Sequence, residues 1–449
     1  MKKRIRFNGR AICNWVLIIL IVSIWSKNDN SPNNEVPNNL NVKVATYGGS
    51  LNDNANSVIA TSDGGYAVLG YTQSNDGDIV DKTTTDFDFW MLKFDSTSSL
   101  QWQKSYGGSS NDRGNALIQT SDGGYALLGF SESKDGDVTE NAGAQDYWLA
   151  KTDSNGNLVW QKSFGFNGRD EGISLIQTND SGFLLVGVLD VTASEGQGNV
   201  TAKNHAGGDY WAIKLSEDGV LQWSQYFGGT FTETAYGVVE IDGGGFLIAG
   251  SSDSFDVDIS NNKGTYDFWV VRISDTGQLL WEKNYGGNEI DEPHGIVPTI
   301  EGNFLIVGDT RSTDIDIASN NGAADVWAVK INAEGEILWE SAYGGSGFDA
   351  GRGVEAINDG GFLLVGSSRS GDIDVAENKG QNDAWLIKID ADGILEWEQS
   401  IGGSEIEVGY DVVELANGTI VAVGESASSD FDVLVNKGFT DVLVISVEP

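Results

Sequence analysis

The amino-acid sequence predicts an all-β fold, a seven-bladed β-propeller of four-stranded antiparallel blades. Three observations predict it: one structural unit recurs seven times, each unit holds strand-length apolar segments between glycine-rich turns, and the two ends of the array complete one another. The 449 residues include 59 glycines and only five prolines, with aromatic residues at 10% of the chain. This composition is typical of a folded, turn-rich β protein rather than a disordered acidic chain.

The repeat is marked by an aromatic or apolar residue that precedes a Gly-Gly pair. These anchors are Tyr47, Tyr106, Phe227, Tyr285, Tyr343 and Ile401, with Phe164-Gly165-Phe166 as a degenerate copy. Successive anchors lie 59, 58, 63, 58, 58 and 58 residues apart. A nearly constant period over the whole array predicts one closed ring, although the length alone would suggest about three domains.

The second unit shows how each repeat divides into four strands. We expect these strands at Asn115–Thr120, Tyr125–Ser131, Asp146–Thr152 and Leu158–Phe164. The turns between them at 121–124 and 153–157 contain the glycines that tight hairpins require. The second strand is apolar at almost every position, which is typical of a strand covered on both faces by neighbouring sheets.

The two ends of the array predict how the ring closes. The segment Val42–Tyr47 is equivalent to the last strand of a unit, and Asp441–Val447 is equivalent to the third. Pairing the two would complete a seventh sheet and remove the open edges that invite aggregation.

Tryptophan placement supports the same architecture. Twelve of the 14 tryptophans recur at two positions: Trp90, Trp148, Trp211, Trp269, Trp327 and Trp385 in the third strand, and Trp102, Trp160, Trp223, Trp281, Trp339 and Trp397 in the fourth. Stacking on a ligand is one interpretation of these rings. Their recurrence in every ordinary unit favours the other, packing between blades.

The N-terminus predicts export. We divide the chain into a signal peptide or N-terminal membrane anchor at 1–26, a linker at 27–40 and the propeller at 41–449. The first ten residues hold five lysines and arginines, and Trp15–Trp25 is a nearly unbroken apolar run too short to span a bilayer comfortably. The protein is therefore expected in the cell envelope or outside the cell, with membrane contact only through this segment.

The residues after the apolar run bear on lipidation. Ser26–Asn30 resembles the start of mature bacterial envelope lipoproteins, but Trp25 stands where the lipid-bearing cysteine would be. The single cysteine, Cys13, precedes the apolar run. We therefore expect no disulfide in the propeller.

The charge of the chain limits its partners. Without residues 1–40, 21 basic residues face 64 acidic ones, for a net charge near −43. Such a surface repels nucleic acid and anionic lipid, and it favours cations and basic partners.

Four recurring motifs carry a family resemblance. Tyr-Gly-Gly-x-x-x-Asp, Asp-Gly-Gly-Tyr, Gly-x-Ser and Asp-x-Trp-x-x-Lys resemble the bacterial β-propeller repeat family known as SBBP, over residues 42–447. The resemblance implies the fold and a secreted or envelope location, and no particular activity. The segment Ser274–Trp281 is also similar to the tryptophan-docking repeat of quinoprotein and outer-membrane-assembly propellers, whose units are shorter. Quinone chemistry is therefore not expected here, and no cofactor other than Ca²⁺ is considered.

The connections alternate between the two faces of a meander ring. The Gly-Gly connection between units and the long loop between the second and third strands therefore share one face, which we expect to be the functional one. An acid follows each anchor by six residues, at Asp53, Asp112, Asp170, Glu233, Asp291, Asp349 and Glu407. Six long loops add an Asp-x-Asp pair, so the loop face is predicted to be acidic.

These loops hold the oxygen ligands that Ca²⁺ prefers, without the spacing of an EF-hand. The candidate ligands are Asp135, Asp137, Asn141, Asp146, Asp256, Asp258, Asn262, Asp267, Asp314, Asp316, Asn320, Asp325, Asp372, Asp374, Asn378 and Asp383. The alternative is that these side chains cap their own loop backbone as Asx turns.

Catalytic candidates are few. The propeller has no cysteine, no nucleophile elbow, P-loop or HExxH motif, and only two histidines. His205 lies in the longest of the long loops, and His294 is expected in the connection Asp291–Gly295 on the same face. We predict an exported, non-enzymatic binding or scaffold module that presents its acidic loop face to a protein, glycan or cation. The alternative is a glycan-active hydrolase or lyase with His205 and His294 as acid and base.

Overall fold

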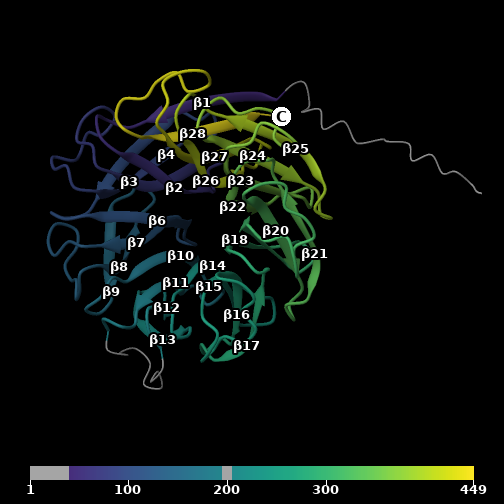
Figure 1. The fold of residues 1–449 in the computed structure, drawn as a ribbon. Helices are drawn as coiled ribbons and strands as arrows, with labels where there is room; N and C mark the ends of the chain where they lie inside the picture. Colours follow the sequence, from purple (N-terminus) through teal and green to yellow (C-terminus); the bar gives the residue numbers. More distant parts are fainter. Residues whose placement is uncertain (1–39, 195–204, 449) are drawn as a thin grey trace, which may run out of the picture. The chain divides into compact units, whose positions relative to one another are not determined.

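The computed structural model describes residues 40–194 and 205–448, and within them every regular element is a β-strand. The 28 strands form seven four-stranded antiparallel sheets arranged in a ring (Figure 1). This confirms the predicted fold class. Residues 1–39, which hold the predicted signal peptide or anchor and nearly all of the linker, lie outside the described residues. No helix among the described residues has the length and apolarity to cross a membrane.

Each blade begins with its innermost strand. Blade 1 is β2 Asp53–Ala60, β3 Tyr66–Thr72, β4 Asp88–Phe94 and β5 Leu100–Tyr106; blade 2 is β6 Asp112–Gln119, β7 Tyr125–Ser131, β8 Asp146–Thr152 and β9 Leu158–Phe164; blade 3 is β10 Glu171–Gln177, β11 Phe183–Asp190, β12 Gly208–Leu215 and β13 Leu221–Phe227. Blade 4 is β14 Glu233–Glu240, β15 Phe246–Ser252, β16 Asp267–Ile273 and β17 Leu279–Tyr285; blade 5 is β18 Asp291–Pro298, β19 Phe304–Thr310, β20 Asp325–Ile331 and β21 Ile337–Tyr343. Blade 6 is β22 Asp349–Ala356, β23 Phe362–Ser368, β24 Asp383–Ile389 and β25 Leu395–Ile401; blade 7 is β26 Glu407–Glu414, β27 Ile420–Ser426, β28 Asp441–Glu448 and β1 Asn41–Tyr47.

The seam closes as predicted. Strand β1 pairs antiparallel with β28, with Val42 opposite Val447 and Tyr47 opposite Val442. The first and last strands of the array therefore lie in one sheet (Figure 1). Closure leaves no blade without its fourth strand.

The strand bounds in blade 2 agree with the prediction except at the inner strand. That strand runs from Asp112 to Gln119, because Asp112 already pairs with Ser131 of β7, and its buried carboxylate accepts a hydrogen bond from the Gly108 amide at 2.8 Å. In six blades the acid after the anchor is the first residue of the inner strand, and in blade 3 Asp170 immediately precedes that strand.

The core lies between blades. Trp148 of blade 2 is fully buried, and its ring centroid lies 4.6 Å from that of Phe89 in blade 1. Trp102 covers the hairpin turn between β8 and β9 of the next blade so closely that a Cβ on Gly156, whose φ is 75°, would approach the indole to 2.9 Å. The packing interpretation of the tryptophans is thus confirmed at both positions.

Candidate functional site on the loop face and axial channel

The long loop and the Gly-Gly connection pack against each other in every ordinary blade. In blade 1 the Gly48 amide donates to Asp78 at 3.0 Å, and the Ser50 amide donates to Asp76 at 2.7 Å. Both kinds of connection therefore lie at the same end of the ring, which we call the loop face. The two short hairpin turns lie at the opposite end.

The Asp-x-Asp pairs cap the connection that enters their own blade. The first Asp accepts a backbone N–H at 2.7–3.1 Å and the second accepts the amide of the first anchor glycine at 3.0–3.3 Å. The candidates with this role are Asp135, Asp137, Asp256, Asp258, Asp314, Asp316, Asp372 and Asp374. The capped backbone lies 26 or 30 residues earlier, so the caps fasten two segments together instead of forming local Asx turns.

The remaining calcium candidates also have loop partners. The side-chain amides of Asn141, Asn262, Asn320 and Asn378 donate to a carbonyl ten residues earlier at 2.7–3.3 Å. Asp146, Asp267, Asp325 and Asp383 accept a backbone N–H from four residues earlier at 2.5–2.9 Å. Among residues 40–194 and 205–448, no group of three or more Asp, Glu, His or Cys side chains is arranged to hold a metal ion. Calcium binding stays a prediction.

Buried carboxylates meet where consecutive blades join. At the junction of blades 5 and 6, Asp325 and Asp349 are both fully buried, and a Cβ on Gly344 would touch both carboxylates. Burial first, and then Asp349 and Asp374, raise the pKa of Asp325 to about 6. One oxygen of Asp325 is buried without a hydrogen-bond partner. Such pairs are costly to ionise together.

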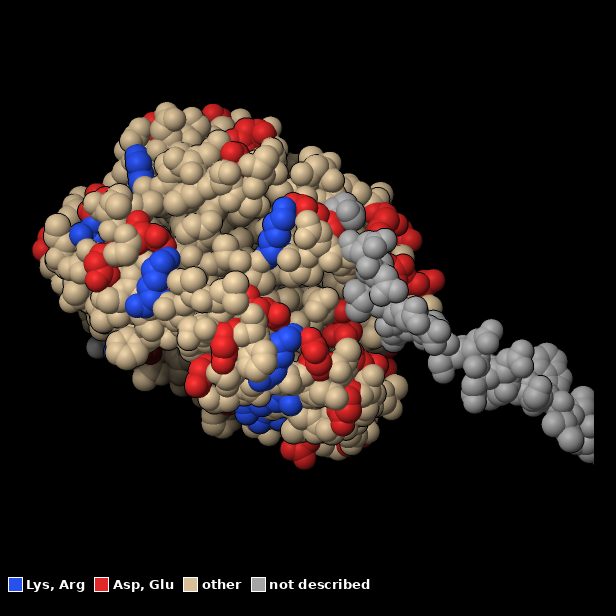
Figure 2. Space-filling model, turned by 90° about the horizontal axis from the view of Figure 1, so that it is seen from above, with Lys and Arg blue, Asp and Glu red and all other residues tan. Residues whose placement is uncertain are grey.

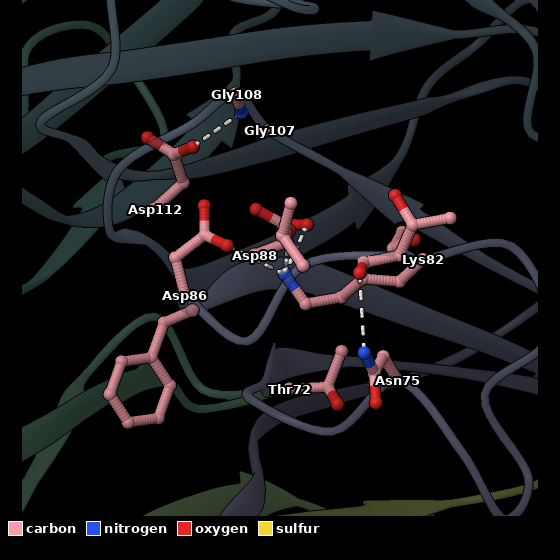
Figure 3. Close-up of polar contacts among 12 residues, drawn as sticks. Thr72, Asn75, Lys82, Asp86, Asp88, Gly107, Gly108 and Asp112 are labelled. Carbon is pink, nitrogen blue, oxygen red and sulfur yellow. Dashed lines mark hydrogen bonds and ion pairs between the residues drawn. The ribbon is translucent and has the colours of Figure 1, made fainter.

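Most junctions carry a basic side chain that offsets this charge. Lys263 pairs with Asp316, Lys379 with Asp432 at 3.0 Å and Lys437 with Asp78 at 2.5 Å. Figure 3 shows the junction of blades 1 and 2, where Lys82 reaches Asp88 at 2.7 Å and Asp86 at 3.7 Å beside the Asp112–Gly108 hydrogen bond. Burial nevertheless raises the pKa of Asp88 to about 7. On the face in Figure 2, acidic and basic side chains are likewise interspersed.

His205 takes the place of such a lysine. It lies four residues before the buried Asp209, as Lys263 does before Asp267, and its Nδ1 pairs with the Asp209 carboxylate. Burial lowers the pKa of His205, but the Asp209 hydrogen bond and charge outweigh it and leave the pKa raised. The structure therefore gives His205 a charge-neutralising role at the junction of blades 3 and 4.

His294 is not in a loop-face connection, contrary to the prediction. It lies within the inner strand β18, where it is the extra residue of a β-bulge between Pro293 and Gly295. The bulge turns its side chain into the axial channel of the ring. His205 and His294 share no hydrogen bond, ion pair or ring contact in the described chain.

All seven inner strands carry a bulge at this position. The bulged residues are Asn56, Asn115, Ile173, Tyr236, His294, Arg352 and Tyr410, and all of them line one axial cavity of about 670 Å³. Sequence reasoning missed this ring because its members differ from blade to blade. Their signal was available all the same, as the third residue after each repeated acid.

The channel is polar and asymmetric. The Arg352 guanidinium contacts both ring nitrogens of His294, and Asp309 lies 3.4 Å from His294 Nε2. Burial first, and also the Arg352 charge, lower the pKa of His294. The neutral imidazole of His294 can accept a hydrogen bond from a ligand in the channel or donate one to it, and the neighbouring Arg352 guanidinium can donate hydrogen bonds.

A separate feature marks the loop face of blades 4 to 7. The residue between the two aspartates of Asp-x-Asp has a positive φ in all six motifs: Gly77, Gly136, Val257, Ile315, Ile373 and Phe431, at 51–67°. Glycine adopts this conformation freely, whereas a bulky side chain costs about 1–2 kcal/mol there. The four bulky residues are 46–66% exposed, so burial of their side chains in the described fold does not offset this conformational cost.

This conformational cost arises from a close approach of the side chain to the backbone of the Gly-Gly connection. A Cβ on Gly77 would lie 2.4 Å from the carbonyl oxygen of Gly48, which accepts the Asp78 amide. That backbone hydrogen bond measures 3.0 and 2.9 Å in blades 1 and 2 but 3.2–3.4 Å in blades 4 to 7. The bulky side chains therefore push the long loop away from the connection beneath it. We call Val257, Ile315, Ile373 and Phe431, with the 61% exposed neighbour Phe255, the apolar arc.

Comparisons with known proteins give no family. No family model matches the chain. The chain is 25% identical over 424 residues to the regulatory protein FlaEY of Caulobacter vibrioides, across 86% of this chain and 42% of that protein. It thus spans less than half the length of this relative.

The solved structures that the chain matches have low sequence identity to it. They include BamB of Moraxella catarrhalis, with 14% identity, a TM-score of 0.40 and coverage of 92% of this chain and 100% of that one. Sqt1 of Chaetomium thermophilum has 12% identity and a TM-score of 0.43 over 86% of this chain and 83% of its own. The predicted SBBP membership stays a resemblance.

Proposed function

We propose that this protein is an exported, non-enzymatic binding propeller whose apolar arc receives a basic, partly apolar segment of a protein partner. One observation carries the proposal: four consecutive blades hold a bulky apolar residue, exposed and in a strained backbone conformation, where two other blades use glycine. Backbone strain that packing within the fold does not offset is typical of functional positions.

The chemistry of the arc favours this class of partner over a glycan or a cation. Exposed Val, Ile and Phe side chains gain by burial against apolar groups, which a metal ion lacks and a sugar offers only in part. The four strained arc residues each stand between two aspartates, for example Ile373 between Asp372 and Asp374. A segment that combines apolar and basic side chains matches both features.

The test uses labelled peptides and a variant that copies blades 1 and 2. Fluorescence anisotropy at 150 mM salt would compare a Lys/Leu peptide with Lys/Ser and Glu/Leu peptides of equal length. We expect the Lys/Leu peptide to bind best, and V257G/I315G/I373G/F431G to weaken it at least about tenfold, which needs only 1.4 kcal/mol. Because glycine suits these backbone angles, the variant should remain folded.

The matched control lies on the opposite face. Val220 and Ile394 are 63% and 58% exposed in the short hairpin turns, and V220S/I394S should leave binding unchanged. Equal binding of the Lys/Leu peptide by wild-type protein and the glycine variant would refute the proposal. Glycan turnover lost in H294A would instead support the hydrolase or lyase alternative.

A further inference from the structure

Two arginines line the axial channel, and a third lies against an aromatic residue of its lining. The described residues include six arginines, at Arg113, Arg169, Arg272, Arg311, Arg352 and Arg369. Arg352 and Arg369 line the axial cavity together with Phe348. The guanidinium carbons of Arg311 and Arg369 lie 5.4 and 5.8 Å from the centroid of that same Phe348 ring. Arg311 of blade 5 and Arg369 of blade 6 thus lie against one aromatic ring at the channel, and Arg352 lines the same cavity.

These arginines have no carboxylate partner despite the acidity of the chain. Every ion pair among the described residues is made by a lysine or a histidine, and none of the six arginines takes part in one. The Arg369 Nε donates to the Asn382 side chain at 2.5 Å, which orients its guanidinium without neutralising it. Arg352 contacts the neutral His294 ring. The positive charge of all three therefore remains available.

Glu171 and Asp411 line the cavity and Glu292 and Asp309 lie near it, but none of these acids forms an ion pair with an arginine. Burial, and after it the Asp309 charge, raises the pKa of Glu292, whereas the charges of Arg352 and Arg311 lower it. Glu171 is on the other side of the ring, where its carboxylate accepts the Asn115 amide at 2.9 Å. Asp309 lies beside His294 and is only 2% exposed. The cavity thus combines unpaired cations with hydrogen-bonding groups and the rings of Tyr236 and Tyr410.

We propose that the part of the axial channel lined by Arg352 and Arg369 binds a small molecule with an anionic oxygen group on a sugar-sized body. The anionic group is a carboxylate or a phosphate. Guanidinium groups bind both oxyanions through paired N–H donors, and their fixed fork favours them over lysine for this task. A cavity of about 670 Å³ falls in the range of small-molecule sites. The aromatic and amide side chains among the seven bulged residues of the inner strands would face the body of the ligand. This site is distinct from the apolar arc and does not depend on it.

Isothermal titration on the whole protein tests the proposal. The probes are glucuronate and glucose 6-phosphate, with glucose as the neutral analogue and inorganic phosphate as the oxyanion without a body. We expect either sugar anion to bind at least tenfold more tightly than glucose and than inorganic phosphate. Preference between the two sugar anions identifies carboxylate or phosphate as the recognised group. Higher salt should weaken binding, since the attraction is partly electrostatic.

The variant R311Q/R369Q removes two exposed guanidiniums and should weaken binding of the sugar anion at least tenfold. The matched control K104Q/K162Q removes two positive charges from outer strands of blades 1 and 2 and should bind as the wild type does. The proposal is overturned if glucose binds as tightly as the sugar anions, if both double variants bind equally, or if neither anion binds at 10 mM. Peptide binding by the apolar arc should persist in R311Q/R369Q, so the two proposals fail separately.

Discussion

The backbone amide of Asn321 donates to the buried carboxylate of Asp325 at 2.7 Å, at a repeat position where three other blades place a lysine. The side chain of Lys263 pairs with Asp316, and that of Lys379 with Asp432. At the junction of blades 5 and 6 the described residues offer no such cation, so Asp325, Asp349 and Asp374 meet without one.

Asn321→Lys should therefore stabilise the protein. The new ammonium can reach Asp374 as Lys379 reaches Asp432, and a partly buried pair of this kind contributes about 1 kcal/mol. Urea unfolding at pH 7.5 should show a higher free energy of unfolding for the variant. The reverse change, Lys379→Asn, should lower it. A less stable N321K protein would show that the carboxylates of this junction are already neutral.

The junction carboxylates also predict a pH dependence. Burial raises the pKa of Asp88 and Asp267 to about 7, and that of Asp383 to about 6, above the values of the unfolded chain. The folded state then holds more protons than the unfolded state between about pH 4 and 7, so stability falls as the pH rises through this window. The melting temperature should be higher at pH 5 than at pH 8.

Two controls isolate the junctions. Asp325→Asn removes one raised pKa of about 6 and should flatten the dependence between pH 5 and 8. Asp63 and Asp122 in the hairpin turns have pKa values lowered to about 2, with Lys93 and Lys151 as partners. Their contribution is lost only as the pH falls from about 4 toward 2, outside the window. A melting temperature that rises from pH 5 to 8 would contradict the assignment.

The fold could be predicted because repetition reports it seven times over. The anchor glycines, the Asp-Gly-Gly turns and the paired tryptophans each recur at one place in the blade, so a single assignment fixed all copies. The residues that line the channel could not be found in that way. Arg352 and His294 stand at a repeat position that changes in most blades, and only the β-bulge shows that this position faces the channel. The prediction for His294 failed because its Pro-His-Gly sequence is typical of a turn, while the pairing of β18 with β19 on both sides of the bulge keeps it in the sheet.

Relief of backbone strain can be measured at Ile373. Ile373→Gly removes a β-branched residue from a left-handed backbone conformation, which relieves about 1–2 kcal/mol of strain in the folded state. The greater freedom of glycine in the unfolded chain offsets about 0.4–1 kcal/mol of this gain. We expect equal or higher stability by chemical denaturation. Gly136→Ile is the matched opposite and should lose about 1–3 kcal/mol, since its Cβ would meet the Gly107 carbonyl at 2.4 Å. A destabilised I373G protein would mean that the isoleucine packs within the fold and is not held for a partner.

Calcium should act on the loops only if it displaces their caps. Asp372 and Asp374 each accept backbone hydrogen bonds from the connection below, at 2.8 and 3.2 Å. If these caps are the main role of the loops, millimolar Ca²⁺ against EGTA should leave the melting temperature unchanged, and Asp372→Ala should lower it in both. A rise with Ca²⁺ that Asp372→Ala abolishes would establish a metal site at this loop.

The pKa values of the two histidines should be shifted from the ordinary value in opposite directions. The chain has only two, so H205Q and H294Q assign both imidazole signals in an NMR titration. Asp209 holds the pKa of His205 above its ordinary 6.5, whereas burial and Arg352 hold that of His294 below it. At pH 6.5 His205 should therefore be mostly charged and His294 mostly neutral. An oxyanion bound beside Arg352 should offset the guanidinium charge and raise the pKa of His294 while leaving His205 unchanged. Movement of both signals together would mean that the anion acts through ionic strength and not at the channel.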